Sequence, residues 1–419
     1  MYQAPRGTQD VLPEDEKYWR YVEDTAVRVA KQFGYGLIRT PTFEDTSLFI
    51  RGVGESTDIV TKEMYTFLDK GGDSLTLRPE ATAPIMRAYL EHGMYNRPQP
   101  VRLYCLMSMY RYDRPQAGRF REFHQFDCEA IGDGAPDVDA ETILLAWRFL
   151  EALGLRSLTV QLNSIGCPGC RPHYLEALVE HFTAHKMQLC HDCQRRLEVN
   201  PLRLLDCKQE QCQPAILSAP ASVDHLCREC QEHFADVRKL LEGLNLPLIL
   251  NPRLVRGLDY YTRTVFEIWP TTVGAQSAVC GGGRYDGLME QLGGKPTPAI
   301  GFAAGIERII LNIKEQGVQI PEVGKPDLYV AYVGDVARAA AFQLADEARR
   351  MGLSCVSAVG SRSLKAQLKQ ANSLGSRFAF ILGEQEVQTG TVTVRDLVES
   401  KQWQEGKDAA MSRLLETKR

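Results

Sequence analysis

Two stretches with strand-like apolar patterns, residues 101–112 and 120–131, flank a short polar segment. That segment, Arg-Pro-Gln-Ala-Gly at 114–118, has turn chemistry because proline fixes φ and glycine tolerates a positive φ. The pattern therefore predicts an antiparallel hairpin with a longer loop.

One face of the second predicted strand is polar and aromatic, since side chains alternate along a strand. Its residues are Arg121, Phe123, Gln125, Asp127 and Glu129. A cation, a flat ring, an amide and two carboxylates suit a ligand with a phosphate, a base and an amine. Arg111 and Arg119 add planar guanidinium groups that match phosphate oxygens. The alternative is a solvated hairpin face of mixed charge.

Helical and strand patterns also alternate in the N-terminal region. Apolar residues recur at helical spacing from Trp19 to Phe33, and Gly34 ends this predicted helix. A second helix follows the peptide Arg-Pro-Glu-Ala-Thr at 78–82. Glu80 and Thr82 lie near its start, where an acid is a common cap. The alternative is that Glu80 pairs with a ligand ammonium group.

The middle of the chain carries an amphipathic helix at 139–153 and a short strand at 159–162. A cysteine-rich region with helical pieces at 174–182 and 234–241 follows. It predicts an inserted helical subdomain over 167–245, within a catalytic domain that spans 1–322.

Three peptides after this region combine strand patterns with glycine. The first contains Arg-Gly-Leu-Asp-Tyr-Tyr at 256–261, in which Arg256 is a permanent cation beside a glycine that permits close approach. Tyr260 and Tyr261 offer rings with polar tips. The second has three glycines at 281–283, which often mark close approach by a ligand. The third, 299–309, reads as strand, small residues and helix.

The C-terminal region predicts a separate α/β domain. Residues 317–326 carry glycine and proline and read as a linker. Strands and helices then alternate over 326–419, which is typical of a partly parallel sheet. Between 348 and 383 there are six basic residues and no acidic ones. Arg362, Lys365 and Lys369 are predicted on one helical face, a footprint for nucleic acid, although a solvated face is the commoner explanation.

Composition limits the possibilities. With 419 residues, 44% hydrophobic and 24% charged, the chain can build the cores of two or three domains. It has no apolar run of about 18 residues and no apolar signal core, so we expect a cytoplasmic protein without a membrane partner. The net charge of −4 does not indicate nucleic-acid binding. Contacts to phosphate depend on local basic patches, however, and not on the total charge of the chain.

Eight of the twelve cysteines lie between residues 167 and 230, in four pairs. Without a secretion signal, disulfides are not expected. Three Cys-x-x-Cys pairs have the local spacing of a structural zinc site. The candidate ligands are Cys190, Cys193, Cys227 and Cys230. The alternative, reduced thiols without metal, is favoured.

These peptides together resemble the class II aminoacyl-tRNA synthetases. Residues 110–129 resemble the second signature motif of that class, in a form typical of the histidyl-tRNA synthetase family, and 256–261 resembles a peptide peculiar to that family. Residues 33–44 and 299–309 resemble the first and third motifs. The resemblance implies a mainly antiparallel catalytic sheet flanked by helices (α+β), a helical insertion that clamps the acceptor arm of the tRNA, and an α/β anticodon-binding domain at 326–419.

The resemblance also implies substrates and residue roles. The family joins histidine to ATP, which is used with Mg²⁺, and transfers histidine to tRNA(His) as a homodimer. Arg256 and Arg111 would act on the α-phosphate, while Arg119, Phe123 and Arg308 complete the ATP site. Residues matching the histidine site are Glu80, Thr82, Gln125, Glu129, Tyr260, Tyr261 and Tyr285. Residues expected to contact tRNA are Gln116, Arg121, Arg362, Lys365 and Lys369.

Two alternatives to this interpretation remain. One is a non-enzyme, the synthetase-like regulatory subunit of ATP phosphoribosyltransferase, which lacks the C-terminal domain and typically the 256–261 peptide. The other is a class IIa synthetase for a different amino acid, against which Tyr260 and Tyr261 argue.

Overall fold

A computed structural model describes residues 2–54, 57–116, 118–271, 278–322 and 324–418. The chain divides into two compact units, Met1–Ile320 and Pro321–Arg419. Each has its own hydrophobic core, so each is described by itself.

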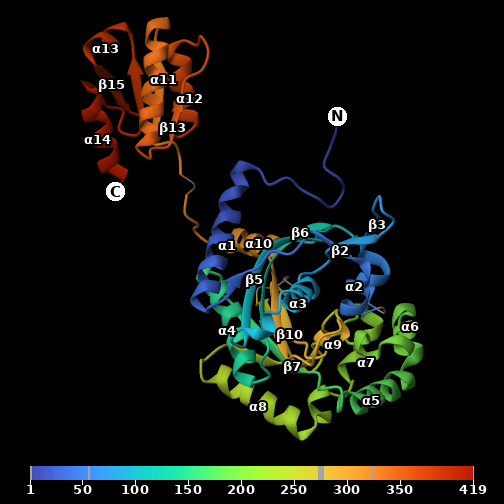
Figure 1. The fold of residues 1–419 in the computed structure, drawn as a ribbon. Coiled ribbons are helices and arrows are strands. Elements are labelled where there is room, and N and C mark those ends of the chain that lie inside the picture. Colours follow the sequence, from blue (N-terminus) through green and yellow to red (C-terminus); the bar gives the residue numbers. More distant parts are fainter. Residues whose placement is uncertain (1, 55–56, 117, 272–277, 323, 419) are drawn as a thin grey trace. The chain divides into compact units, whose positions relative to one another are not determined.

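The first unit is built on an eight-stranded sheet (Figure 1). Its central strands are antiparallel, and only the outermost pair at each edge is parallel. In spatial order the strands are β1 (Gly36–Leu37), β5 (Val101–Tyr110), β6 (Glu122–Ile131), β11 (Ala299–Gly305), β10 (Cys280–Arg284), β9 (Thr262–Pro270), β7 (Leu158–Ser164) and β8 (Leu248–Leu250).

Four helices pack on one face of this sheet. They are α1 (Pro13–Gln32), α4 (Pro136–Ala152), α8 (Arg228–Glu242) and α10 (Ile306–Glu315). Helices α1 and α4 both begin with proline followed by acidic residues, which suits the positive end of a helix. The even-numbered residues of β6, such as Phe126 and Cys128, point into the apolar core beneath these helices.

The opposite face of the sheet carries a smaller apolar core and an open cavity. Helices α3 (Thr82–Glu91) and α9 (Leu288–Gln291) pack there against odd-numbered residues of β5. A three-stranded sheet of β2 (Phe43–Asp45), β4 (Ser74–Leu77) and β3 (Tyr65–Leu68) lies alongside, with α2 (Thr46–Val53). The alternation along β5 and β6 therefore separates a closed core from a ligand-accessible face.

The cysteine-rich region forms α5 (Arg171–Ala184), α6 (His191–Val199), α7 (Gln213–Leu217) and α8. The first three share a small core around Leu178 and Phe182. Helix α8, by contrast, contributes Phe234, Val237 and Leu241 to the main core beside α4. The predicted limits of the insertion, 167–245, stay a prediction.

The second unit contains a five-stranded, partly parallel sheet. Its strands, in spatial order, are β13 (Cys355–Ser357), β12 (Leu328–Tyr332), β14 (Phe378–Leu382), β15 (Thr391–Asp396) and β16 (Gln402–Gly406). The helices are α11 (Asp335–Arg350), α12 (Leu364–Ser373), α13 (Glu384–Thr389) and α14 (Lys407–Lys418). The predicted fold class, a mainly antiparallel α+β unit followed by an α/β unit, is confirmed. Within the described ranges, no helix is both long and apolar enough to span a bilayer.

Candidate active site

The ligand-accessible face of the sheet forms a cavity of about 1050 Å³. The hairpin of β5 and β6 is antiparallel, as predicted, and Phe123, Gln125, Asp127 and Glu129 all face this cavity. The residues that the sequence assigned to the histidine and ATP sites line it without exception: Glu80, Thr82, Arg111, Arg119, Phe123, Gln125, Glu129, Arg256, Tyr260, Tyr261, Tyr285 and Arg308. Peptides that are far apart in the sequence thus meet at one site.

Glu129 is the centre of a hydrogen-bonded group at the deep end of the cavity. Thr82 Oγ1 donates to Glu129 Oε1 at 2.7 Å, and the Tyr285 hydroxyl donates to Oε2. Burial raises the pKa of the Glu129 carboxyl to about 8, although these two hydrogen bonds favour its charged form. The Glu129 carboxyl is therefore held in one orientation, in which it faces a ligand in the cavity.

Two further carboxyl groups lie near Glu129. Glu80 accepts hydrogen bonds from the backbone N–H groups of Thr82 at 2.8 Å and Ala83 at 2.9 Å, so it caps α3 as well as lining the cavity. Asp127 is buried, and its Oδ1 has no hydrogen-bond partner among the described residues. Burial, with repulsion from Glu129 and Glu80, raises the pKa of Asp127 well above its usual range. Three acids in one pocket favour a cationic ligand.

Three tyrosines enclose the same end of the cavity. The Tyr260 ring lies 4.8 Å from the ring of Tyr261 and 5.5 Å from that of Tyr285, measured between centroids. All three are buried. Together they make a rigid aromatic wall with hydroxyl groups at its edge.

The Arg256 guanidinium lies across the cavity floor and pairs with Glu267 on β9. The second carboxylate oxygen of Glu267 accepts a hydrogen bond of 2.7 Å from the Trp269 indole N–H. Burial lowers the pKa of Arg256, but the Glu267 carboxylate outweighs this and the pKa is raised. Glu267 was not predicted from the sequence, because a single acid on a strand carries no signal of its partner.

A group of cations forms the other end of the cavity. Arg111 donates from Nε to the Pro79 carbonyl at 2.8 Å, and its guanidinium lies 5.3 Å from the centre of the Phe123 ring. Arg308, in the first turn of α10, donates to the carbonyls of Gly118 at 3.2 Å and Ala278 at 3.0 Å. Burial and then repulsion from Arg119 lower the pKa of Arg308. The positive charges lie close enough to repel one another, so this end of the cavity favours the binding of an anion.

The glycines of β10 create space for site residues. A Cβ at Gly281 would lie 2.7 Å from Arg256 Nη1, and one at Gly283 would lie 3.0 Å from Tyr261 Cδ1. Across the sheet, a Cβ at Gly301 would lie 1.6 Å from Glu129 Oε2. The sequence predicted that these glycines allow a ligand to come close. In the structure they also make room for the protein's own side chains. Gly301 was missed because its neighbour lies on another strand.

The two predicted tRNA contacts of the first unit, Gln116 and Arg121, differ in their position relative to the cavity. Gln116 lines the cavity and pairs with Arg119 through a backbone bridge. Arg119 forms an ion pair of 2.7 Å with Asp113. Arg121 is not among the residues that line the cavity. It precedes β6, and its guanidinium lies 3.8 Å from the Tyr112 ring centre, so the predicted alternation does not extend to it.

The basic residues of the second unit that were predicted to contact nucleic acid, Arg362, Lys365 and Lys369, are exposed. Lys365 and Lys369 are on α12, whereas Arg362 lies before that helix and reaches Gln370 at 3.4 Å. The placement of Arg362 on the helical face is therefore corrected. Helix α12 begins later because the Ser363 side chain caps it.

The cysteine pairs combine differently from the sequence expectation. Cys227 and Cys230 lie with Cys167 and Cys170, while Cys190 and Cys193 lie with Cys207 and Cys212. The four candidate ligands therefore belong to two clusters. Local spacing could not show this, because pairing between Cys-x-x-Cys units is set by the tertiary fold.

The comparisons with known proteins agree with this geometry. Residues 7–309 match the family model described as histidyl-tRNA synthetase, and 327–417 match that of an anticodon binding domain. The chain belongs to the histidyl-tRNA synthetase family. The class II resemblance that the motifs predicted is thus confirmed.

Relatives in this family match almost the whole chain. A histidine–tRNA ligase of Dehalococcoides mccartyi is 56% identical over 402 residues, which are 96% of each chain. One from Pelotomaculum thermopropionicum is 50% identical over 95% of this chain and 94% of its own. The crystal structure of the apo histidyl-tRNA synthetase of S. aureus has a TM-score of 0.84 at 39% identity, covering 99% of this chain and all of that one.

Proposed function

We propose that this chain is a histidine–tRNA ligase, with the cavity of the first unit as its active site. The observation that carries the proposal is that one cavity is lined both by a buried group of carboxyl and tyrosine side chains and by four arginines, Arg111, Arg119, Arg256 and Arg308. The first suits the amine and imidazole of histidine, and the second suits the phosphates of ATP.

In the first step, the histidine carboxylate attacks the α-phosphorus of ATP, the bond to the β-phosphate oxygen breaks, and pyrophosphate leaves. Because two anions must meet, electrostatic stabilisation and positioning supply most of the catalysis. Arg111 and Arg256 would bracket the α-phosphate. Arg119 and Arg308 would hold the γ end, and the Phe123 ring would stack on adenine. Magnesium would accompany ATP and neutralise phosphate charge.

Recognition of histidine would rest on the deep end of the cavity. Glu80, Thr82 and Gln125 would bind the α-amino group. Glu129, with Tyr285 behind it, and Tyr261 would bind the imidazole. A site built to hydrogen-bond a substrate edge rejects analogues that lack it by about 10⁴–10⁵-fold, so the pocket alone would provide adequate specificity.

The second step would transfer histidine from the adenylate to the 3′ end of tRNA(His). Gln116 and Arg121 would contact the acceptor end, and Arg362, Lys365 and Lys369 would contact the anticodon arm. The second unit also exposes Phe342 beside a cavity of about 460 Å³. Arg338 lines the same cavity, and an exposed aromatic ring with a cation beside the same cavity suits the stacking of unpaired bases.

We also propose that the chain works as a homodimer. The edge strand β1 exposes Leu37, and the nearby segment exposes Phe43, each 49% accessible. An exposed apolar edge strand is a template for association. Analytical ultracentrifugation of wild type and Leu37→Asp tests this: a monomeric wild type would refute it.

The central experiment is ATP–pyrophosphate exchange measured with each of the twenty amino acids. We expect exchange with histidine alone. Exchange with another amino acid would change the substrate, and no exchange at all would favour a non-enzymatic role.

The role of the second unit is tested by removing residues 321–419. Adenylate formation should largely survive, because its residues lie in the first unit. Charging of tRNA should fall steeply and lose its dependence on the anticodon. A truncated enzyme that still discriminated against a changed anticodon would contradict this assignment.

A further inference from the structure

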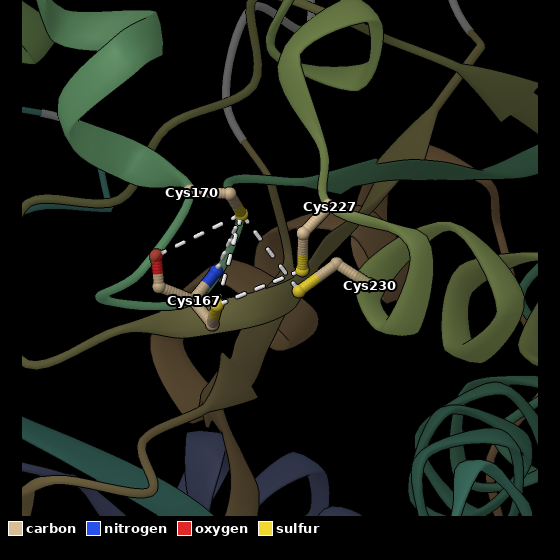
Figure 2. A group of neighbouring side chains, drawn as sticks. All are labelled: Cys167, Cys170, Cys227 and Cys230. Carbon is tan, nitrogen blue, oxygen red and sulfur yellow. Dashed lines mark hydrogen bonds between the residues drawn. The ribbon is translucent and has the colours of Figure 1, made fainter.

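Eight cysteines outside the active-site chemistry form two compact groups. The first cluster contains Cys167, Cys170, Cys227 and Cys230, which converge from the starts of α5 and α8 (Figure 2). Sulfur–sulfur distances are 3.7 Å for Cys167–Cys170 and 3.9 Å for both Cys167–Cys227 and Cys170–Cys230.

The second cluster contains Cys190, Cys193, Cys207 and Cys212. Cys190 and Cys193 lie at the start of α6, and the other two lie on the segment leading to α7. The sulfurs of Cys190 and Cys207 are 3.9 Å apart. In each cluster, all four sulfurs lie within 4.8 Å of one another.

These spacings match a metal tetrahedron. Four sulfurs placed about 2.3 Å from a central zinc are separated by roughly 3.8 Å, whereas a disulfide brings two sulfurs to about 2.05 Å. Independent, unrelated thiols have no reason to form two groups of four with this spacing. Four thiolates in a tetrahedron select zinc or iron–sulfur centres, and spacing around a single point favours a single ion.

The surroundings of the sulfurs also fit bound thiolates. The Cys167 backbone N–H donates to Cys170 Sγ at 3.3 Å, and the Cys190 N–H donates to Cys212 Sγ at 3.2 Å. The Gln209 N–H donates to Cys207 Sγ at 3.5 Å. Outer hydrogen bonds of this kind orient metal ligands. We propose that each cluster binds one Zn²⁺ ion through four cysteine thiolates, giving two structural zinc ions per chain.

The first ion would hold the wall of the histidine pocket in place. Arg171 directly follows Cys170, and its Nη2 donates to the Tyr261 carbonyl at 2.5 Å. The same nitrogen donates to the Gly166 carbonyl at 3.3 Å, and the Arg263 N–H donates to Gly166 at 2.9 Å. A metal that fixes the start of α5 therefore fixes the backbone from the Tyr261 carbonyl to Arg263. This part of the inference rests on the proposed function. Arg171 acts through Tyr261 and is therefore a positioning residue.

The second ion would shape the rim of the active-site cavity. The segment from Leu205 to Lys208, which includes the ligand Cys207, lines that cavity. Arg203, just before this segment, and Arg196, on α6, both reach Asp58 at 3.1 Å. Without the ion, a small core would have to hold these contacts alone.

The test is the zinc content of the full-length protein, purified without chelators and measured by inductively coupled plasma mass spectrometry. We expect two zinc ions per chain, and X-ray absorption showing four sulfurs at about 2.3 Å. Cys227→Ser and Cys193→Ser should each retain one ion, and the double variant none. Cys355→Ser, at a lone cysteine in the second unit, should retain two.

Several results would overturn the proposal. Less than one zinc per chain in the wild type would refute both sites, and one zinc that Cys193→Ser leaves intact would refute the second. Iron in place of zinc, visible in the absorption spectrum, would refute the metal assignment. These outcomes are independent of histidine-dependent pyrophosphate exchange, so they are distinguishable from failure of the proposed function.

The positioning role has its own readout. In Cys227→Ser, the KM for histidine in pyrophosphate exchange should rise by about 10-fold or more, whereas the KM for ATP should change less. Arg171→Gln should reproduce this pattern with two zinc ions still bound. An unchanged KM for histidine in both variants would overturn the link between the first ion and the pocket.

Discussion

Arg256 on the cavity floor is held by Glu267, whose other carboxylate oxygen is occupied by the Trp269 indole N–H. The Arg256 Nε has no hydrogen-bond partner within the described part of the chain. The guanidinium is thus fixed on one side and retains an unused donor. This arrangement orients a cation before substrate arrives, which is how electrostatic catalysis avoids reorganisation during the reaction.

Replacing Arg256 should damage activation more than any other single change. Loss of one donor aimed at developing charge costs on the order of 10²–10³ in rate, so Arg256→Ala should slow adenylate formation by at least that much. Arg256→Lys should rescue it poorly, because a point charge cannot reproduce the planar group. Single-turnover kinetics of both half-reactions measure this, and transfer from preformed adenylate should suffer less.

The matched control is Arg20→Ala, at an exposed arginine on α1 that pairs with Glu16. It should leave both half-reactions unchanged. Near-normal activation in Arg256→Ala would remove this residue from the mechanism.

The buried Glu129 should make stability depend on pH. Its pKa is about 8 in the folded chain but about 4.5 when exposed, so the folded state keeps the proton to higher pH. The free energy of unfolding therefore falls as the pH rises through that window, by at most about 1.4 kcal/mol per pH unit for one proton. Glu129→Gln should flatten this decline, as measured by urea unfolding at several pH values.

Glu122→Gln tests whether any acid on β6 would have this effect. Glu122 lies on the same strand but on the other face and is only partly buried. Its replacement should leave the pH dependence as in wild type. A Glu129→Gln variant with the wild-type slope would show that other carboxyl groups dominate.

Gly301→Ala should disturb the proposed histidine pocket by displacing Glu129. The new methyl group would overlap the Glu129 carboxylate and would also lie 2.6 Å from the Cys128 carbonyl oxygen. Overpacking typically costs about 1–3 kcal/mol, and here it would also displace Glu129. We expect a lower melting temperature together with a raised KM for histidine. Gly287→Ala, where the added Cβ meets nothing within 4 Å, should change neither.

Neutralising the basic helix of the second unit should affect tRNA without affecting activation. The double variant Lys365→Ala with Lys369→Ala should weaken tRNA binding. The slope of log K against log salt concentration should become shallower by about one for each phosphate that a lysine no longer neutralises. Pyrophosphate exchange should remain as in wild type. Lys401→Ala, an exposed lysine of the same unit paired with Glu399, serves as the control. If the salt dependence of tRNA binding were unchanged in the double variant, Lys365 and Lys369 would not be tRNA contacts.

The sequence was most informative where periodicity and a recognisable peptide coincided. Alternation along β6 placed Phe123, Gln125, Asp127 and Glu129 on the correct face, because the other side of the sheet is a closed core. The same rule failed at Arg121, where the strand has not begun. Glu267 and Gly301 could not be found this way, since their importance depends on a neighbour from another strand. The cysteine clusters likewise depend on the tertiary fold, since the first joins cysteines 60 residues apart and the second joins cysteines 17 residues apart.

The glycines of β10 also constrain how this pocket can change over generations. A Cβ at Gly282 would lie 2.0 Å from the Gly301 carbonyl oxygen, and one at Gly283 would lie 2.5 Å from that of Thr264. Because backbone cannot yield as a flexible side chain does, this wall admits almost no variation. A lineage or a laboratory selection that sought a different amino acid substrate would therefore have to find its mutations on β6 and around the tyrosines, leaving β10 as a fixed template.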